Sequence, residues 1–237
     1  MTSPNQQMYN SLQLAISNFD KDNLESYQNV ANHFQKLVES EIQSIWLKHN
    51  YKINLELNNV KLGLVGSTIN GSTAIGYIME EFLTRQLDDT IFQKPMNSTI
   101  NSLYDFKYLD DSKIELMVNL KSEKNTSSNN AICAGTILVE HYLANNKPKL
   151  YLILKSCYSI DEQESIINIS DSSSVFMESF LLNGVSSDNR SWSKEFNPLS
   201  GRIQTPSKTK MKQFSNKSIP YYDHIESFIR NFAQRNQ

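Results

Sequence analysis

Asp105-Phe-Lys-Tyr-Leu-Asp-Asp-Ser-Lys-Ile-Glu-Leu-Met-Val-Asn-Leu-Lys121 is the stretch that decides the fold of this chain. From residue 114 onward every second side chain is aliphatic, which indicates a strand with one face packed on the core. A three-residue loop over 111–113 would pair residue 110 with 114, and therefore 105 with 119. This register is decisive, because a loop longer or shorter by one residue would turn Asp105 to the opposite face.

The predicted hairpin brings an acid, an amide and a lysine together. Asp105 stands opposite Asn119, and Lys121 follows about 7 Å further along the same face. Oxygen ligands of this kind hold Mg²⁺, which polarises a phosphate and lowers the pKa of a bound water. An ammonium group nearby stabilises the attacking hydroxide or the charge that develops on phosphate. The cluster suits phosphodiester hydrolysis, and the alternative is an ordinary hairpin with a solvated polar face.

The spacing Asp-x(13)-Asn-x-Lys resembles the PD-(D/E)xK motif of type II restriction endonucleases. Two segments, Phe106-Lys-Tyr-Leu-Asp110 and Lys149-Leu-Tyr-Leu-Ile-Leu154, and the order of elements from about residue 60 to 235 are also similar to this superfamily. The resemblance implies an α/β fold with a restriction-endonuclease-like core, in which helices flank a mixed central sheet. It further implies Mg²⁺-dependent cleavage of double-stranded DNA, with Asp105 as a metal ligand and Lys121 as the catalytic lysine.

Asn119 departs from that motif, because it occupies the position of the second metal-binding acid. An amide oxygen can still ligate a metal, but the missing negative charge is expected to weaken Mg²⁺ binding and to slow the chemistry. Three interpretations stay open: a natural variant in an active enzyme, a deliberate inactivating change that traps uncut DNA, or a non-catalytic relative.

Further acids lie near the hairpin in sequence. Helical glutamates often add a metal or general-base contact in such folds, and Glu80 and Glu81 are the candidates here; the alternative for both is a solvated helix face. Glu115 shares the face of Asn119 but lies about 13 Å along the strand, too far for one ion, so we interpret it as structural. Glu123 continues the face beyond Lys121, and we expect it to be solvated.

A basic segment lies between residues 190 and 217, with seven Lys or Arg residues against one acid. We expect the loop around it, about 186–218, to contact DNA, because lysines neutralise phosphates while Arg, Asn and Gln read base edges. Residues 201–205 suit an edge strand laid toward a groove. The alternatives are a solvated basic loop and, for the polar stretch 125–130, a plain connection. The predicted DNA-binding residues are Asn125, Ser128, Asn129, Arg190, Lys194, Arg202, Gln204, Lys208 and Lys210.

Composition bounds the class of protein. The 237 residues are 39% hydrophobic, show no repeat or dividing linker, and support a single domain over residues 1–237. The net charge of -2 means that any attraction to DNA must come from a local patch. We expect a cytoplasmic protein without membrane contact, because the chain lacks a long apolar run and an apolar leader. Cys133 and Cys157 are expected to be reduced core thiols, and the four histidines show no metal-ligand spacing.

The other predicted elements surround the hairpin. They are a helix at 24–47, a strand beginning in 51–65, a helix at 71–87, a loop at 97–102, a buried helix at 131–143, a central strand at 149–156 and an amphipathic helix around 225–232. The stretch Gly66-x(4)-Gly71-Ser72-Thr73 is similar to a phosphate-binding loop but lacks its lysine, so we expect a tight helix entry near a DNA phosphate instead of nucleotide hydrolysis.

The leading hypothesis is a Mg²⁺-dependent, sequence-specific DNA endonuclease that acts as a homodimer, since cutting both strands of a palindrome calls for two-fold symmetry. A second hypothesis is a non-catalytic DNA-binding protein on a degenerate nuclease fold. A third is a structural or interaction protein without a nucleic-acid role. Duplex binding over a salt series separates the third from the others, because phosphate contacts lose affinity steeply as salt rises.

Overall fold

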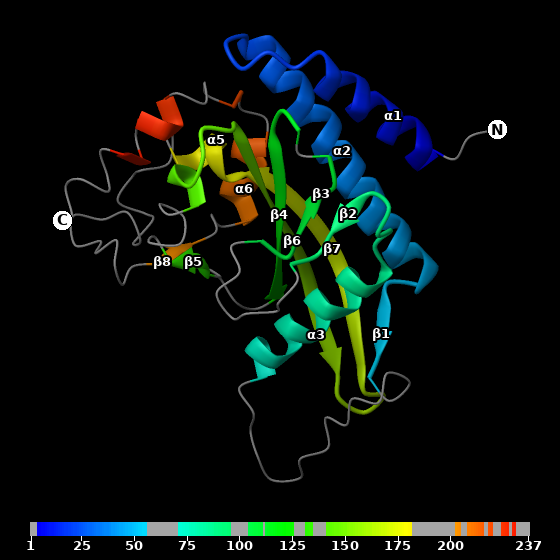
Figure 1. The fold of residues 1–237 in the computed structure, drawn as a ribbon. Helices are drawn as coiled ribbons and strands as arrows, with labels where there is room; N and C mark the ends of the chain where they lie inside the picture. The colour runs from blue at the N-terminus through cyan, green and yellow to red at the C-terminus, as the bar shows by residue number, and fades with distance from the viewer. Residues whose placement is uncertain are drawn as a thin grey trace.

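The fold is seen in a computed structural model, which describes residues 4–55, 71–95, 104–110, 112–125, 131–134, 141–181, 202–204, 208–215, 218–219, 224–227 and 229–230. Its helices are α1 (Pro4–Ser17), α2 (Leu24–Lys48), α3 (Gly71–Gln86), α5 (Met177–Leu181) and α6 (Lys208–Ser215). Its strands are β1 (Lys52–Asn54), β2 (Phe92–Gln93), β3 (Phe106–Tyr108), β4 (Glu115–Lys124), β5 (Ala131–Ala134), β6 (Lys149–Asp161), β7 (Ile166–Phe176) and β8 (Arg202–Gln204). Figure 1 shows their arrangement.

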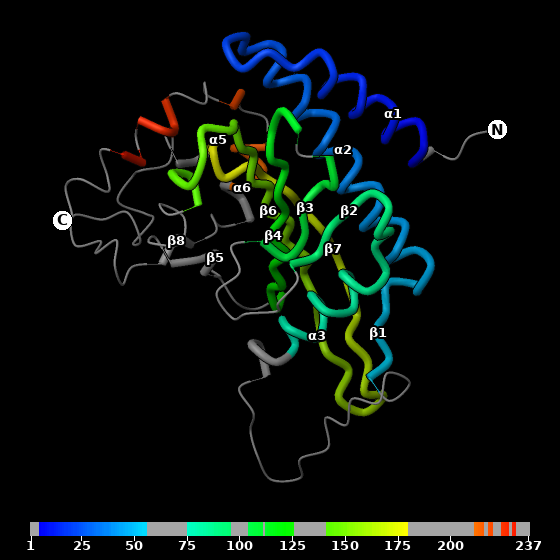
Figure 2. Tube along the Cα trace, viewed as in Figure 1, coloured from blue at the N-terminus to red at the C-terminus, as the bar shows by residue number. Residues whose placement is uncertain are grey.

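Six strands form one sheet in the order β1-β7-β6-β4-β3-β2. Strands β4 and β6 are parallel, whereas the other neighbouring strands in this sheet are antiparallel. Figure 2 shows β4 and β6 running together with β7 beside them. The expected mixed α/β fold, a mixed sheet flanked by helices, is therefore confirmed.

The hairpin formed by β3 and β4 has the predicted register. Phe106 pairs with Val118 and Lys107 with Met117, which is the alignment that a loop over 111–113 was expected to give. Residues 105 and 119 follow next in the same register. The central strand predicted at 149–156 is also present, as the first part of β6.

Opposite faces of the sheet are covered by different helices. Helix α2 covers one face, where Gln35 donates to the Ser174 hydroxyl at 2.8 Å and that hydroxyl donates to Glu39 at 2.6 Å. The neighbouring Ser173 points the other way and donates to the Met211 sulfur of α6 at 4.0 Å. Side chains that share a face with Ser173 therefore lie on the α6 side of the sheet, away from α2.

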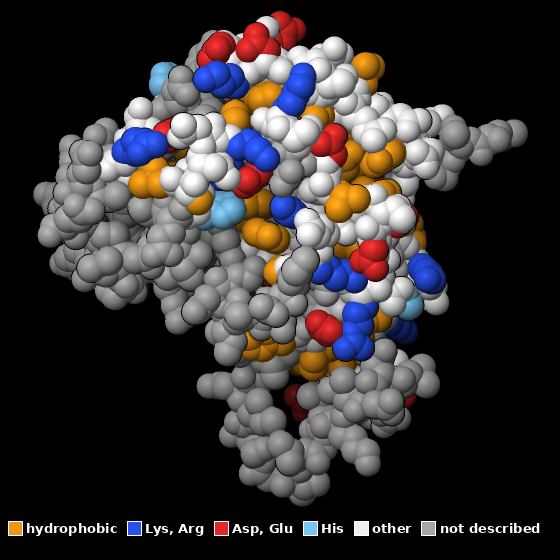
Figure 3. Space-filling view, in the orientation of Figure 1, with side chains coloured by type: hydrophobic (Ala, Val, Ile, Leu, Met, Phe, Trp, Pro, Cys, Tyr) orange, Lys and Arg blue, Asp and Glu red, His pale blue; other side chains and the backbone are white. Residues whose placement is uncertain are grey.

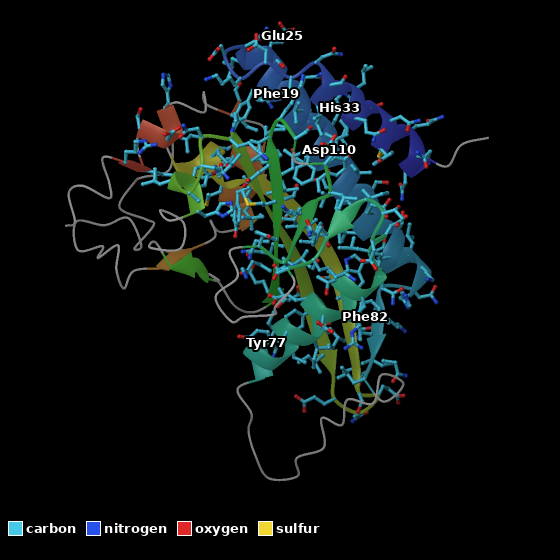
Figure 4. All side chains as sticks on the ribbon, viewed as in Figure 1. Phe19, Glu25, His33, Tyr77, Phe82 and Asp110 are labelled. Atoms are coloured by element: carbon cyan, nitrogen blue, oxygen red, sulfur yellow. The ribbon has the colours of Figure 1, made fainter. Side chains whose placement is uncertain are left out.

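Helix α2 confirms the prediction for residues 24–47. Its N-cap, Asn23, accepts hydrogen bonds from the backbone N–H groups of Glu25 and Ser26, which satisfies two of the donors that a helix start leaves open. The apolar residues of α2, from Tyr27 and Val30 to Ile45 and Trp46, are buried. At the end of α2, the indole of Trp46 stacks on Phe82 of α3 with ring centroids 5.8 Å apart, so α3 is anchored to α2 (Figure 4).

The predicted helix at 131–143 is wrong at its start. Residues 131–134 form β5, which pairs with β8 in a separate two-stranded sheet, and 141–143 are helical. Periodicity alone does not tell whether a short apolar run is a helix or a strand. Here pairing with a strand that is distant in sequence makes residues 131–134 a strand. The pairing partner, β8, is the strand expected within 201–205.

Five described elements, α1, β2, α5, β7 and α6, were not predicted. Helix α1 lies in the polar beginning of the chain but buries Leu12, Ala15 and Ile16, which are spaced as one helical stripe. Strand β7 was missed because serines and an aspartate interrupt its apolar pattern. The basic segment is not one loop, since it contains β8 and α6. The 97–102 loop and residues 66–70 of the glycine-containing stretch lie outside the described residues.

The predicted terminal helix agrees with the described part of that region, where 224–227 and 229–230 are helical and Ile225 and Ile229 are buried. Over the part of the chain that the structure describes, no helix combines the length and apolar character that crossing a membrane requires.

Candidate active site on the central strands

The predicted acid, amide and lysine lie on one face of the sheet. In the observed registers Lys121 is paired directly with Lys155, and Lys155 with Ser173, so all three share one face of the sheet, the face on which α6 packs against β7. Asn119 is two residues before Lys121 and therefore points the same way. Phe106 is paired with Val118 in the antiparallel register. Asp105, the residue before Phe106, therefore lies across from Asn119, the residue after Val118. The polar face is not solvated, since only 3% of Asn119 is exposed.

Asp105 is tied to the strand that carries the other two residues. Its backbone N–H donates to the Val118 carbonyl at 2.9 Å, and its Oδ2 accepts from the Leu120 N–H at 2.6 Å. Burial raises the pKa of the Asp105 carboxyl, while the Lys121 charge and the Leu120 hydrogen bond oppose that rise. The carboxylate is thus fixed just before the start of β3, near the lysine.

Helix α3 adds Glu80 to this cluster. Its Oε1 lies 3.8 Å from the Lys121 Nζ, and both side chains are largely buried. The pKa of Glu80 is raised to about 7, first by burial and then by the negative charge of Asp105, while the positive charge of Lys121 opposes the rise. Because Asp105 and Glu80 influence one another, the two carboxyls and the ammonium form one electrostatic unit.

Gly76 explains how α3 comes so close to β4. A Cβ atom at this position would meet the Ser122 hydroxyl oxygen at 3.2 Å, which is tighter than ordinary contact. Glu80 follows one helical turn later and so lies on the same side of α3. Glu81, the other helical candidate, is exposed and pairs with Arg85 at 2.6 Å, so it does not join the cluster.

Sequence reasoning missed a second ion pair beside the site. Lys155 is fully buried, and its Nζ lies 2.9 Å from Oε2 of Glu123. The expectation that Glu123 is solvated is therefore wrong, because a buried lysine on the adjacent strand supplies its counter-charge. The signal that could have found the pair is a lysine inside the apolar run of the central strand, since a buried lysine needs an acid.

Glu115 has the structural role that the sequence indicated. Its Oε2 lies 3.3 Å from the His141 Nε2, and its Oε1 accepts from the Asn145 amide at 3.1 Å. The hydrogen bond from His141 is the largest of the effects that lower the pKa of Glu115 to about 2. These contacts lie at the beginning of β4, away from Asn119 and Lys121.

The donor set at the candidate site is compatible with one hard divalent cation. It offers the carboxyl oxygens of Asp105 and Glu80 and the amide oxygen of Asn119, which are the ligand types that Mg²⁺ prefers. Burial raises the pKa of both acids, and the Lys121 charge opposes that rise. Among the described residues no group of three His, Cys, Asp or Glu side chains is positioned to hold a metal, so an amide would complete the set.

The predicted DNA-binding residues fall into three groups. Asn125 is exposed at the end of β4, where its Oδ1 accepts from the Ser170 hydroxyl at 3.0 Å. Arg202 and Gln204 belong to β8, and Lys208 and Lys210 belong to α6, where the structure describes the backbone. Ser128, Asn129, Arg190 and Lys194 lie outside the described residues.

Among the described residues on the face drawn in Figure 3, the charges do not separate into one basic region. On the face drawn in Figure 3, Lys, Arg, Asp and Glu side chains are intermixed over the described elements. Phe214, one of the aromatic residues interleaved with the basic segment, is buried with Met211 on the inner side of α6. This aromatic ring therefore packs in the core and is not available for stacking on a base.

No protein-family model and no curated protein matches the sequence.

Proposed function

We propose that this chain is a Mg²⁺-dependent, sequence-specific double-stranded DNA endonuclease with a restriction-endonuclease-like core. The observation that supports the proposal most is the convergence of Asp105, Asn119 and Lys121 on one face of the central strands, with Glu80 of α3 3.8 Å from Lys121. Two carboxyls, an amide and a lysine are the groups that metal-assisted phosphodiester hydrolysis needs.

In this proposal Glu80 provides the second negative charge that Asn119 lacks. Asp105, Glu80 and the Asn119 amide oxygen would hold the ion, which supplies Lewis-acid polarisation of the phosphate and a water of lowered pKa. Lys121 directs its ammonium at the attacking hydroxide or at the phosphate oxygens, where it stabilises negative charge that grows during the reaction. Glu80 must be deprotonated to act as a ligand, so its raised pKa sets a lower limit on the working pH.

DNA binding in the proposed enzyme comes from the basic segment and the polar loop after Lys121. Lys208 and Lys210 of α6 neutralise phosphates, and Arg202 and Gln204 of β8 are placed to read bases. The enzyme acts as a homodimer, because cutting both strands of a palindrome calls for two-fold symmetry.

Cleavage of mixed plasmid DNA tests the proposal directly. The chain as written and Asn119→Asp are incubated with plasmid DNA and Mg²⁺, and discrete fragments are expected, formed faster by Asn119→Asp. Duplex binding is measured in parallel at low salt. If neither protein cuts DNA and neither binds the duplex, the endonuclease proposal is wrong.

The second candidate function, a non-catalytic DNA-binding protein, is favoured by one observation, the amide at position 119. It predicts duplex binding that Lys121→Ala leaves unchanged, and no cleavage by Asn119→Asp. Binding without cleavage by any of these proteins would select it.

A further inference from the structure

Two lysines stand side by side on the central strands and have different acid partners. Lys121 of β4 is paired directly with Lys155 of β6, and neighbouring strands lie about 4.8 Å apart. The Lys121 Nζ lies 3.8 Å from Glu80, whereas the Lys155 Nζ lies 2.9 Å from Glu123. The Lys121 ammonium is therefore directed at Glu80 and the Lys155 ammonium at Glu123, which keeps the two positive charges apart.

From their positions on the strands alone, Glu123 would be expected to pair with Lys121 and not with Lys155. Glu123 lies two residues beyond Lys121 on the same face of the same strand, about 7 Å away along it. Lys155 is a diagonal neighbour of Glu123 on the next strand, and its backbone is farther from that of Glu123 than the backbone of Lys121 is. Glu123 is 7% exposed, and a carboxylate so buried needs a counter-charge. Lys124 is adjacent to Glu123 but points to the opposite face, so without Lys155 the nearest lysine of this strand on the face of Glu123 is Lys121.

We propose that Lys155 is a positioning residue, which neutralises Glu123 and thereby leaves the Lys121 ammonium directed at Glu80 and Asp105. The inference rests on the proposed function, since it assigns Lys121 to the reacting phosphate. Lys155 itself does not touch the substrate, because it is fully buried and its ammonium is held by Glu123.

Removal of Lys155 has two opposite consequences. Glu123 takes Lys121 as its partner, so the ammonium leaves the reacting phosphate and cleavage slows. Glu80 and Asp105 lose a neighbouring positive charge at the same time, so a divalent cation binds them more tightly. General damage to the fold would weaken both properties together, so opposite changes distinguish positioning from damage.

The first experiment uses Lys155→Met in the full-length chain. A crystal structure is expected to show the Lys121 Nζ beside Glu123 and no longer beside Glu80. Calorimetric titration with Mg²⁺ is expected to give an affinity on the order of tenfold higher. Single-turnover cleavage of DNA is expected to fall on the order of tenfold or more, because misplacing a reacting group by about 1 Å has effects of this size.

The second experiment uses the double variant Glu123→Gln/Lys155→Met, in which no competing acid remains. Replacing both partners of a buried ion pair with neutral residues is often tolerated, so we expect this protein to fold even if the single variant does not. Lys121 is expected beside Glu80, with Mg²⁺ affinity and cleavage rate close to those of the parent chain.

Two results would overturn the proposal. The first is a crystal structure of Lys155→Met in which Lys121 remains beside Glu80. The second is a double variant that retains its Mg²⁺ affinity but no longer cleaves DNA, which would mean that Lys155 contributes its charge to the reaction directly. A parent chain that cuts no DNA would refute the proposed function, whereas the positions of Lys121 in the two crystal structures would still decide the role of Lys155.

Discussion

The carboxyls of Glu80 and Asp105 share one lysine. Glu80 carries a raised pKa because it is buried and because Asp105 adds negative charge, and Lys121 compensates both acids only in part. If the proposed ion binds here, the pair is expected to release a proton when it does, because a carboxyl must be deprotonated to act as a ligand.

Mg²⁺ binding is therefore expected to depend on pH through Glu80. Below the pKa of about 7 the proton must leave before the carboxylate ligates the ion, so affinity falls with decreasing pH and levels off above about 7. Calorimetric titrations at a series of pH values test this. Glu80→Gln is expected to bind Mg²⁺ tenfold or more weakly and with little pH dependence between about 6 and 8.

The matched control is Glu81→Gln on the same helix. Glu81 is exposed and pairs with Arg85, so its loss is expected to leave both the affinity and its pH profile unchanged. Equal effects of the two substitutions would mean that α3 contributes only a diffuse charge and that Glu80 is not a ligand.

A second buried acid, Glu178, is expected to make the stability of the protein depend on pH. Burial raises its pKa to about 7, although Tyr142 donates a hydrogen bond to its Oε1 and the Tyr151 N–H donates to the same oxygen at 3.0 Å. A raised folded-state pKa favours folding fully below the unfolded value near 4.5, and the benefit is lost as the pH rises through about 7. We expect about 3 kcal/mol of unfolding free energy to disappear over this window.

Glu178→Gln tests that expectation, because a neutral amide of the same shape has no proton to lose. Urea unfolding at pH values from about 4.5 to 8 should show the stability of the variant rising by about 3 kcal/mol relative to the parent. A constant difference over this range would show that Glu178 keeps an ordinary pKa in the folded protein.

At the scale of elements, the approach of α3 to β4 positions the site. The contact is closest at Gly76, where an added Cβ atom would lie 3.2 Å from the Ser122 hydroxyl oxygen. Gly76→Ala is expected to push the helix outward by a few tenths of an ångström and to carry Glu80 away from Lys121. Mg²⁺ affinity should fall severalfold, while overall stability changes by less than about 1 kcal/mol, because alanine favours the helix.

The double variant Gly76→Ala/Ser122→Ala provides the control for this contact. It removes the hydroxyl that the new methyl group would meet, so Mg²⁺ affinity should return toward the parent value when measured by the same titration. An affinity that stays low would show that the glycine matters for a reason other than its distance from β4.

How well an element could be predicted depended on whether its pattern was local. The β3–β4 hairpin followed from alternation and a short loop, and its register placed Asp105 across from Asn119 as expected. Residues 131–134 were misread as helix because their partner strand lies about 70 residues away in the chain. A long-range pairing of this kind leaves little trace in a four-residue apolar run.

The candidate site shows the same limit. Asp105, Asn119 and Lys121 were predictable because one hairpin carries all three. Whether Glu80 or Glu81 joins the site could not be predicted, because it depends on which side of α3 faces the sheet. The Glu123–Lys155 pair required knowing that β4 and β6 are parallel neighbours, which sets Lys155 beside Lys121.

At the scale of the whole molecule, the small net charge means that no overall electrostatic attraction would draw the protein to DNA. The chain carries a formal charge of -2, and its charged side chains are intermixed on the face shown in Figure 3. Proposed DNA binding therefore depends on few local phosphate contacts. Duplex affinity in gel-shift assays should fall on the order of tenfold or more between about 50 and 200 mM salt. Affinity that is independent of salt would contradict a phosphate-contacting surface.

The central claim is that Lys121 acts on a phosphate at a site that also binds Mg²⁺. Its most direct test is the single-turnover rate of DNA cleavage by the parent chain, by Lys121→Ala, and by Lys124→Ala, a matched control at the exposed end of β4. The account predicts Mg²⁺-dependent cleavage that Lys121→Ala slows by about a hundredfold or more and that Lys124→Ala leaves nearly unchanged. Equal rates for the two variants, or cleavage that persists without divalent ions, would contradict it.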